Sequence, residues 1–420
     1  MPTASVLSDQ RAPAKQPQGR LPQGTAFAGT AAAFVSLYLA AGAPTPLLAF
    51  YLRQWNFAPP LLTLAFAVYA GGFLAALLTV GSLSDHIGRR PVLLGALLVQ
   101  LGSMIMFLSA ADIRLVIAAR IVQGAATGAA TTAFSATLVE LAPLARKNLG
   151  TILGSVGMAG GLAVGALLSG VAIEYSSQPN NLVFISLAVI TVLGIIVVVF
   201  APDTAQRRAG ALRSLIPRSA IPRAARAEFA AAAPAVAAAW MLAGLSLGLA
   251  PAIVRNVFHF DSGLVNGLAS FVGPIASAVA GLAFIRVDGR SGMILGILAS
   301  IIGTAGILAG ILAGSIGLMI AGQILGGIGF GAAFSAALRL IIPLVSPEER
   351  GATVASIYIV AYLAFSVPVV LVGLLAASVG LLPAVAAYAI ATCLLGSISL
   401  FGQAKQHQRQ APALVPRPTA

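Results

Sequence analysis

The chain alternates long apolar runs with short polar segments. The polar segment GSLSDHIGRR at 81–90, for example, lies between apolar runs on both sides. A helix that crosses the hydrocarbon core of a bilayer needs about 20 mostly apolar residues. The pattern therefore predicts twelve transmembrane helices, at 27–51, 60–82, 91–110, 114–138, 149–173, 182–201, 229–253, 263–285, 292–312, 315–341, 352–376 and 381–402.

The composition excludes a soluble fold. Hydrophobic residues make up 59% of the 420 positions and charged residues 8%, and the mean hydropathy is +0.98. Soluble domains carry about a quarter charged residues. The runs are continuous and do not alternate as barrel strands do, and helices satisfy their own backbone polar groups in lipid. We therefore predict an all-α integral membrane protein.

Three longer polar segments divide the chain. Residues 1–26 and 403–420 are expected to be cytoplasmic tails, and the first of them has no apolar core of a signal peptide. The basic segment 202–228 is the longest internal connector. It separates a predicted N-terminal bundle, 27–201, from a C-terminal bundle, 229–402.

Positive charge is unequally divided between the two sides of this topology. With both termini inside, 19 of the 24 Lys and Arg residues fall in cytoplasmic segments, and only Arg53, Arg114 and Arg255 fall outside. The positive-inside rule therefore predicts cytoplasmic termini, in a plasma membrane that we expect to be a bacterial inner membrane. The basic loops would contact anionic lipid headgroups. Their scatter along the chain disfavours a nucleic-acid partner, despite a net charge of +13.

The two predicted bundles repeat each other. RIVQGAATGAA at 120–130 aligns with QILGGIGFGAA at 323–333, in the fourth span of each half. The loop at 81–90 has a weaker counterpart in GLAFIRVDGR at 281–290, where Ile285 replaces the acid. A repeat of about half the chain length predicts two pseudo-symmetric six-helix bundles.

The loop at 81–90 contains a recognisable motif formed by Gly81, Asp85, Gly88, Arg89 and Arg90. It resembles the loop signature of the major facilitator superfamily, and the twelve spans, the repeat and the basic central connector match the same family. The resemblance implies secondary transport by alternating access. It also implies that Asp85 acts as a gate, by contacting the second bundle near the start of span eleven. A carboxylate at a helix N-terminus is favoured by about 0.3–1 kcal/mol. The alternative is a loop whose charges only fix membrane orientation.

Arg120 lies in an apolar span, about 9 Å from its outer end at 1.5 Å per residue. A charge at that depth normally faces the bundle interior. With Gln123, it resembles the family's fourth-helix motif, whose arginine is associated with proton-coupled members. Arg120, Gln123 and Glu140 are therefore the candidates for coupling. Alternatively, Arg120 extends towards the membrane surface or bonds to carbonyl groups of a neighbouring helix. Gln323 replaces it in the second half.

Gly157, Gly161 and Gly165 lie on one face of span five, which predicts close packing with a neighbouring helix. They match part of the family's antiporter signature, but Leu162 replaces its proline and Ala166 its last glycine. The resemblance implies export, and the two departures leave an uptake permease open.

The lysines and acidic residues of the sequence limit which energy source could drive transport. None of the three lysines lies in a Gly-Lys-Ser/Thr phosphate loop. All eleven acids lie in tails, in loops or near span ends. Proton coupling would therefore depend on Asp85, Arg120 and Glu140, and a uniporter stays open. The three His and one Cys lack metal-ligand spacing, so we expect neither a metal nor a cofactor.

The substrate is expected between the bundles, near the bilayer midplane. Pro44 and Pro46 should break the first span and free carbonyl groups for a ligand. With no acid in the cavity, a small apolar or amphipathic organic solute is favoured over a phosphorylated anion. We expect a monomer and no enzymatic activity; a receptor or scaffold is the alternative of another class. Further lining candidates, each of which could instead pack between helices, are Tyr38, Trp240, Gln323, Tyr358 and Tyr362.

Overall fold

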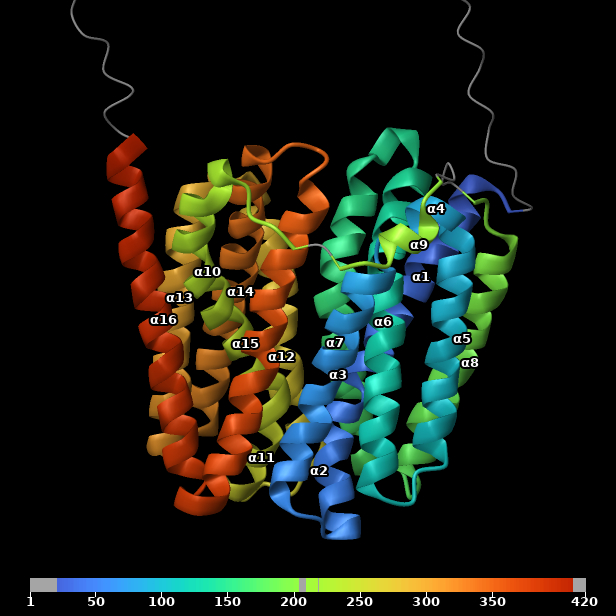
Figure 1. The fold of residues 1–420 in the computed structure, drawn as a ribbon. Coiled ribbons are helices and arrows are strands. Elements are labelled where there is room, and N and C mark those ends of the chain that lie inside the picture. Colours follow the sequence, from blue (N-terminus) through green and yellow to red (C-terminus); the bar gives the residue numbers. More distant parts are fainter. Residues whose placement is uncertain (1–20, 204–208, 218, 411–420) are drawn as a thin grey trace, which may run out of the picture.

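The computed structural model describes residues 21–203, 209–217 and 219–410. Within these ranges the chain is helical, and 12 helices are long and apolar enough to cross a membrane. The predicted class, an all-α protein with twelve spans, is confirmed. Figure 1 shows the helices as two bundles standing side by side.

The first bundle contains the first six spans. The first span is divided into α1 (Gln23–Gly42) and α2 (Pro44–Trp55). The other five are α3 (Pro59–Val80), α5 (Arg89–Leu108), α6 (Ile113–Leu141), α7 (Asn148–Tyr175) and α8 (Pro179–Phe200). The short helices α4 (Ser84–Ile87) and η1 (Leu144–Arg146) lie in its loops.

The second bundle repeats this arrangement. Its first span consists of α10 (Arg226–Gly244), a π-helical turn η3 (Leu245–Leu249) and α11 (Ala250–Asn256). The other five are α12 (Gly263–Ala283), α13 (Gly289–Leu312), α14 (Ile316–Ile341), α15 (Arg350–Val379) and α16 (Leu381–Gln410). The connector between the bundles contains α9 (Ala211–Ser214) and η2 (Arg223–Ala225), while η4 (Phe284–Arg286) and η5 (Ile342–Leu344) end two helices.

Several helices extend beyond the apolar runs that predict them. The first begins at Gln23 instead of 27, the seventh span begins at Arg223 instead of 229, and α16 continues to Gln410 instead of ending near 402. Hydropathy marks the part of a helix that lies in lipid, whereas the backbone hydrogen bonds of the helix continue through polar residues beyond it. The predicted tail boundaries therefore shift, and the tail residues 1–20 and 411–420 lie outside the described ranges.

The predicted break in the first span lies at Ala43, between α1 and α2. Proline has no N–H group, so Pro44 cannot donate to the carbonyl of Ala40 one turn before it. The seventh span is interrupted at a comparable place by η3, which Pro251 follows closely. The repeat therefore includes a broken first helix in each bundle.

Two pairs of helices form most of the interface between the bundles: α7 packs against α12, and α3 packs against α15. The helix α2 also contacts α11 and α12. We call the end of the molecule that carries α4 and α9 the α4 end, and the opposite end, with α2 and α11, the α11 end (Figure 1).

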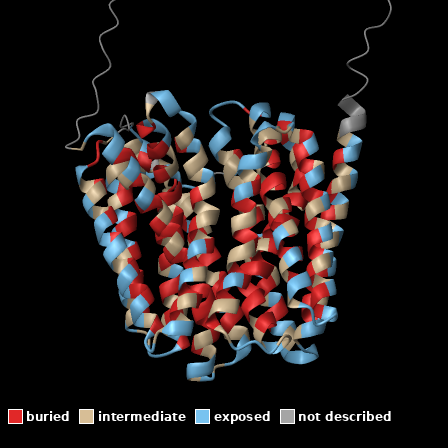
Figure 2. Ribbon diagram, turned by 180° about the vertical axis from the view of Figure 1, so that it is seen from behind, coloured by how far each residue is buried: buried red, intermediate tan, exposed pale blue. Residues whose placement is uncertain are grey.

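The outer surface of both bundles is apolar. Figure 2 shows buried residues between the helices and exposed residues on their outer faces. The exposed residues include many large hydrophobic side chains, such as Leu98, Ile105, Leu193, Ile302 and Leu394. In a soluble protein, so large an apolar surface would drive aggregation, so this surface is suited to lipid.

Candidate functional site

Arg120 is buried inside the first bundle, with 2% of its surface exposed. Its guanidinium carbon lies 4.4 Å from the centre of the Tyr69 ring. The guanidinium donates hydrogen bonds to four neutral oxygens: Ala41 O at 3.1 Å, Gln123 Oε1 at 2.7 Å, Ala65 O at 3.3 Å and Phe66 O at 3.5 Å. Arg120 therefore bonds to carbonyl groups of neighbouring helices and does not extend to the membrane surface.

The break in the first span takes part in this network. Gln123 Nε2 donates to the carbonyl of Ala40 at 2.8 Å, the group that loses its helical donor at Pro44. Both Pro44 and Pro46 are buried. We expected the proline break to free carbonyl groups for a ligand, but Gln123 occupies the freed carbonyl of Ala40, because a buried acceptor needs a donor.

A second cluster of charges forms at the α4 end around Arg89. This side chain pairs with Asp85, donates to Ser84 Oγ at 2.8 Å and pairs with Glu140 at 3.1 Å. Glu140 therefore lies with Asp85 and not with Arg120, from which it is separated by about 30 Å along α6 at 1.5 Å per residue. Asp85 is half-exposed and bonds within its own bundle.

The glycines of the same loop allow a tight connection between α3 and α5. Gly88 has a φ of 105°, which glycine adopts without steric cost. The backbone N–H of Arg89 donates to Asp203 Oδ1 at 3.0 Å. Gly81 accepts from Thr132 Oγ1 at 2.6 Å. Arg90 lies in the first turn of α5.

The three glycines of span five face α1. A Cβ atom would lie 3.1 Å from the Phe34 ring at Gly157 and 2.7 Å from Tyr38 Cβ at Gly161. At Gly165 it would overlap the backbone of Leu39. These glycines allow α1 and α7 to approach closely inside the first bundle, as their spacing predicts.

Polar contacts join the bundles at the α11 end. Arg53 pairs with Asp261, and Arg255 donates to Ala49 O at 3.1 Å. Glu174, near the end of α7, accepts from Ser262 Oγ at 2.9 Å, at the start of α12. The bundles are therefore closed against each other at this end.

Close backbone packing accompanies these contacts. A Cβ atom at Gly170 of α7 would lie 2.5 Å from Gly263 O and 2.7 Å from Gly267 Cα of α12. The two helix backbones touch here without intervening side chains, so any separation of the bundles at the α11 end breaks this contact.

Aromatic side chains fill the part of the interface between the bundles where α3 packs against α15. Tyr362 of α15 stacks on Phe73 of α3, with ring centres 4.2 Å apart, and Phe365 lies 4.9 Å from Phe66. Four rings of the second bundle surround Trp240 at 4.8–5.8 Å between centres: Phe330, Phe334, Tyr362 and Phe365. Tyr358 lies 6.1 Å from both Phe334 and Tyr362. We call these residues of both bundles the aromatic interface.

Two further substrate candidates, Tyr38 and Gln323, lie outside the aromatic interface. The Tyr38 hydroxyl hydrogen-bonds to Thr131 at 2.8 Å, within the first bundle. Gln323 is buried, and its amide has no hydrogen-bond partner among the described residues.

The second bundle has its own buried ion pair near the α4 end. Arg290 donates to both carboxylate oxygens of Glu228, at 2.9 and 2.8 Å, and also bonds to Gln403. Beside it, Asp288 caps α13, and the backbone N–H groups of Ser291 and Arg290 hold the pKa of Asp288 below its usual range.

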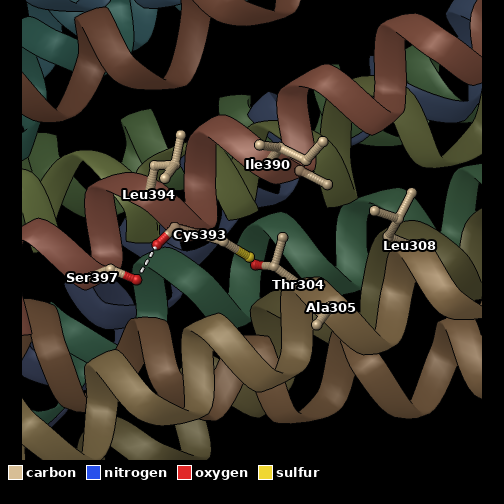
Figure 3. A pocket seen from close by; sticks show the side chains of 8 residues that line it. Thr304, Ala305, Leu308, Ile390, Cys393, Leu394 and Ser397 are labelled. Atoms are coloured by element: carbon tan, nitrogen blue, oxygen red, sulfur yellow. Dashed lines mark hydrogen bonds between the residues drawn. The ribbon is translucent and has the colours of Figure 1, made fainter.

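Two small cavities lie within single bundles. The one in Figure 3 has a volume of about 200 Å³ and lies between α13 and α16. It is lined by Thr304, Cys393 and Ser397 among others, and its rim residues Ile390 and Leu394 are exposed on the apolar surface. The other, of about 340 Å³, lies between α1, α7 and α8. Their linings contain no acidic or basic side chain.

A family model matches most of the described chain. The model of the Major Facilitator Superfamily matches residues 30–286, which include nearly all of the first bundle and the start of the second. The chain belongs to the major facilitator superfamily. Members are transporters, so this chain is a secondary transporter of a small solute and not an enzyme.

Solved structures of transporters share the fold over nearly the whole chain. The human organic anion transporter MFSD10 (TETRAN) is 16% identical, with a TM-score of 0.63; the match covers 90% of this chain and 100% of that one. A bacterial homologue of the human lysosomal transporter Spinster, in an inward-facing and unoccupied conformation, is 13% identical, with a TM-score of 0.67, covering 94% and 99%. No curated protein matches the chain.

Sequence reasoning missed several parts of this major facilitator. The rings of Phe66, Phe73 and Phe365 look like ordinary core residues in the sequence, and no pattern marks their meeting between bundles. The pair of Glu228 and Arg290 is also hidden, since 62 residues separate its members. The alignment of 281–290 with the motif loop at 81–90 is the one signal that could have drawn attention to Arg290.

Proposed function

We propose that this chain is a proton-coupled exporter of a small organic solute, active as a monomer, with its α4 end in the cytoplasm. The positive-inside rule supports this orientation, because Arg89 and Arg90 begin α5 directly after α4, at the α4 end. The partial antiporter signature on α7 supports export over uptake.

One observation carries the proposed mechanism. The polar contacts and the glycine contact of α7 with α12 join the bundles at the α11 end. Asp85, the gate candidate at the α4 end, bonds within its own bundle. This is the arrangement expected when the crevice is closed outwards. Rocking of the two bundles would break the outer contacts and release Asp85 towards the start of α15.

Coupling to protons is proposed to act through groups whose partners change during rocking. Arg120 hydrogen-bonds to backbone carbonyl oxygens of α1 and α3, so its network is sensitive to any movement of these helices. Asp85 and Glu140 share Arg89 at the inner side. Loss of either ion pair would weaken this cluster and favour a different state of the inner gate.

A uniporter is the second candidate. It is favoured by one observation: every carboxylate in the described ranges lies in a loop or near the end of a helix. A proton would then have no carboxylate at mid-depth to occupy.

Inside-out membrane vesicles and proteoliposomes test the proposal. Solutes are first selected by thermal stabilisation of the purified protein, and accumulation is then measured with an imposed proton gradient. We expect accumulation that stops when the gradient is collapsed. The substitution Arg120→Gln should abolish it, while Arg114→Gln, at the exposed start of the same helix, should preserve it. Equilibration that ignores the gradient would instead establish the uniporter.

A further inference from the structure

The Trp240 side chain provides an unused hydrogen-bond donor at the aromatic interface. It is 6% exposed, and its indole N–H has no hydrogen-bond partner among the described residues. Three of the four rings that surround it are phenylalanines, which have no acceptor oxygen, and the Tyr362 hydroxyl does not hydrogen-bond to the indole. A buried N–H without an acceptor is costly, and tryptophan normally finds a partner when it is buried.

The four rings around this donor belong to the second bundle, and two of them, Tyr362 and Phe365, pack against rings of the first bundle. Tyr362, next to Trp240, stacks on Phe73 at 4.2 Å with an angle of 15° between the ring planes. Phe365 meets Phe66 with ring centres 4.9 Å apart and ring planes tilted by 45°. When rocking separates the bundles, each of these rings loses its aromatic partner. A planar solute that slides between them would replace that lost contact.

The charge next to this interface is positive. The guanidinium of Arg120 lies against Tyr69, whose ring centre is 6.2 Å from that of Phe73. It also bonds to the carbonyl of Phe66, the residue whose ring meets Phe365. Its hydrogen-bond acceptors are neutral oxygens. In a low-dielectric interior, a charge without a counter-ion acts over such distances, so it favours an anion and repels a cation.

From these observations we propose that the solute is a planar aromatic compound that carries a hydrogen-bond acceptor, neutral or anionic, and that organic cations are rejected. The acceptor takes the N–H of Trp240, the ring stacks between the aromatic side chains of the two bundles, and Arg120 selects the charge. This inference rests on the proposed transport function and names its substrate class.

The protein offers its own reporter for a test. It contains two tryptophans, Trp55 and Trp240, and Trp55 stacks on Tyr51 outside the aromatic interface. In the variant Trp55→Phe, Trp240 is the only indole, so its emission reports binding at the interface. The probes share one ring system: naphthoate (anion), acetylnaphthalene (neutral acceptor), ethylnaphthalene (no acceptor) and naphthylmethylammonium (cation).

We expect naphthoate and acetylnaphthalene to quench this emission at concentrations roughly tenfold below ethylnaphthalene, since a hydrogen bond of about 1.4 kcal/mol is a factor of ten. Naphthylmethylammonium should bind most weakly. Thermal stabilisation measures the same affinities in Trp240→Phe, which keeps an aromatic six-membered ring and removes the N–H. There the two acceptor probes should lose about tenfold while ethylnaphthalene is unchanged.

Three results would overturn the inference. Equal affinity for the cation and the anion would remove the selection by Arg120. An equal effect of Trp240→Phe on all probes would remove the hydrogen bond. Failure of all four probes to bind, in a protein that still accumulates other solutes in vesicles, would refute the aromatic class and leave the proposed function intact. If no solute is accumulated at all, the proposed function itself fails.

Discussion

The contact between Gly170 and the start of α12 offers a direct way to shift the conformation. An added Cβ would lie 2.5 Å from Gly263 O and 2.7 Å from Gly267 Cα, whereas carbon atoms in contact stay about 3.5–4.0 Å apart. Both neighbours are backbone atoms, so no side chain can move aside. We therefore expect Gly170→Ala to force α7 and α12 apart by about 1 Å, which is the difference between these distances.

The size of the effect follows from packing energetics. Overpacking of this kind costs about 1–3 kcal/mol, and it acts only in the state that is closed at the α11 end. The ratio of closed to open molecules should therefore fall by roughly 5–150-fold. The matched control is Gly160→Ala on the same helix, where an added Cβ meets no atom within 4 Å. Its gain in helix propensity is the same in both states.

Distance distributions between two spin labels measure this ratio. Exposed Ser177 and Phe260 lie at the α11 end of the first and second bundle, and Cys393, the single cysteine, is first replaced by serine. We expect a longer inter-label distance to gain population in Gly170→Ala and not in Gly160→Ala. If both variants match the parent, the closure argument is wrong.

Three further predictions concern the α4 end. Removal of Glu228 by alanine should leave the buried charge of Arg290 without the Glu228 carboxylate and destabilise the protein by about 3–5 kcal/mol, seen as a large fall in Tm; a fall as small as that of the exposed Arg53→Gln would contradict it. Asp85→Asn should slow turnover in proteoliposomes without changing insertion, and unchanged turnover would remove the proposed gate. Asp288→Ala should cost about 1 kcal/mol at neutral pH through loss of a helix cap. Because the pKa of Asp288 is lowered in the folded state, its carboxylate stabilises the fold at neutral pH, and this difference should vanish as the pH falls through that pKa; a difference independent of pH would count against it.

Arg120 shows how far sequence reasoning about the site reaches. Its depth in an apolar span predicts an interior position, and it lies there. Its partners include backbone carbonyls of α1 and α3. The sequence cannot indicate which carbonyl groups accept these hydrogen bonds, because every residue carries the same group. Glu140 was grouped with Arg120 as a coupling candidate, yet it pairs with Arg89. Glu140 and Arg120 are both polar residues of α6, but they lie too far apart along this helix to contact each other.

The sequence by itself determines that the protein lies in a lipid bilayer, that it is helical and that its two halves repeat each other. Runs of about 20 apolar residues can satisfy their backbone groups in lipid only as helices, so the number of spans and the two halves follow from hydropathy and the alignment of 120–130 with 323–333. The tertiary structure alone decides which faces of these helices meet. An apolar side chain has a similar free energy whether it contacts lipid or another apolar side chain. Hydropathy therefore carries no information about the contact of Gly170 with Gly263, or of Phe73 with Tyr362. Those contacts are set by shape, and they are the ones on which the proposed transport cycle depends.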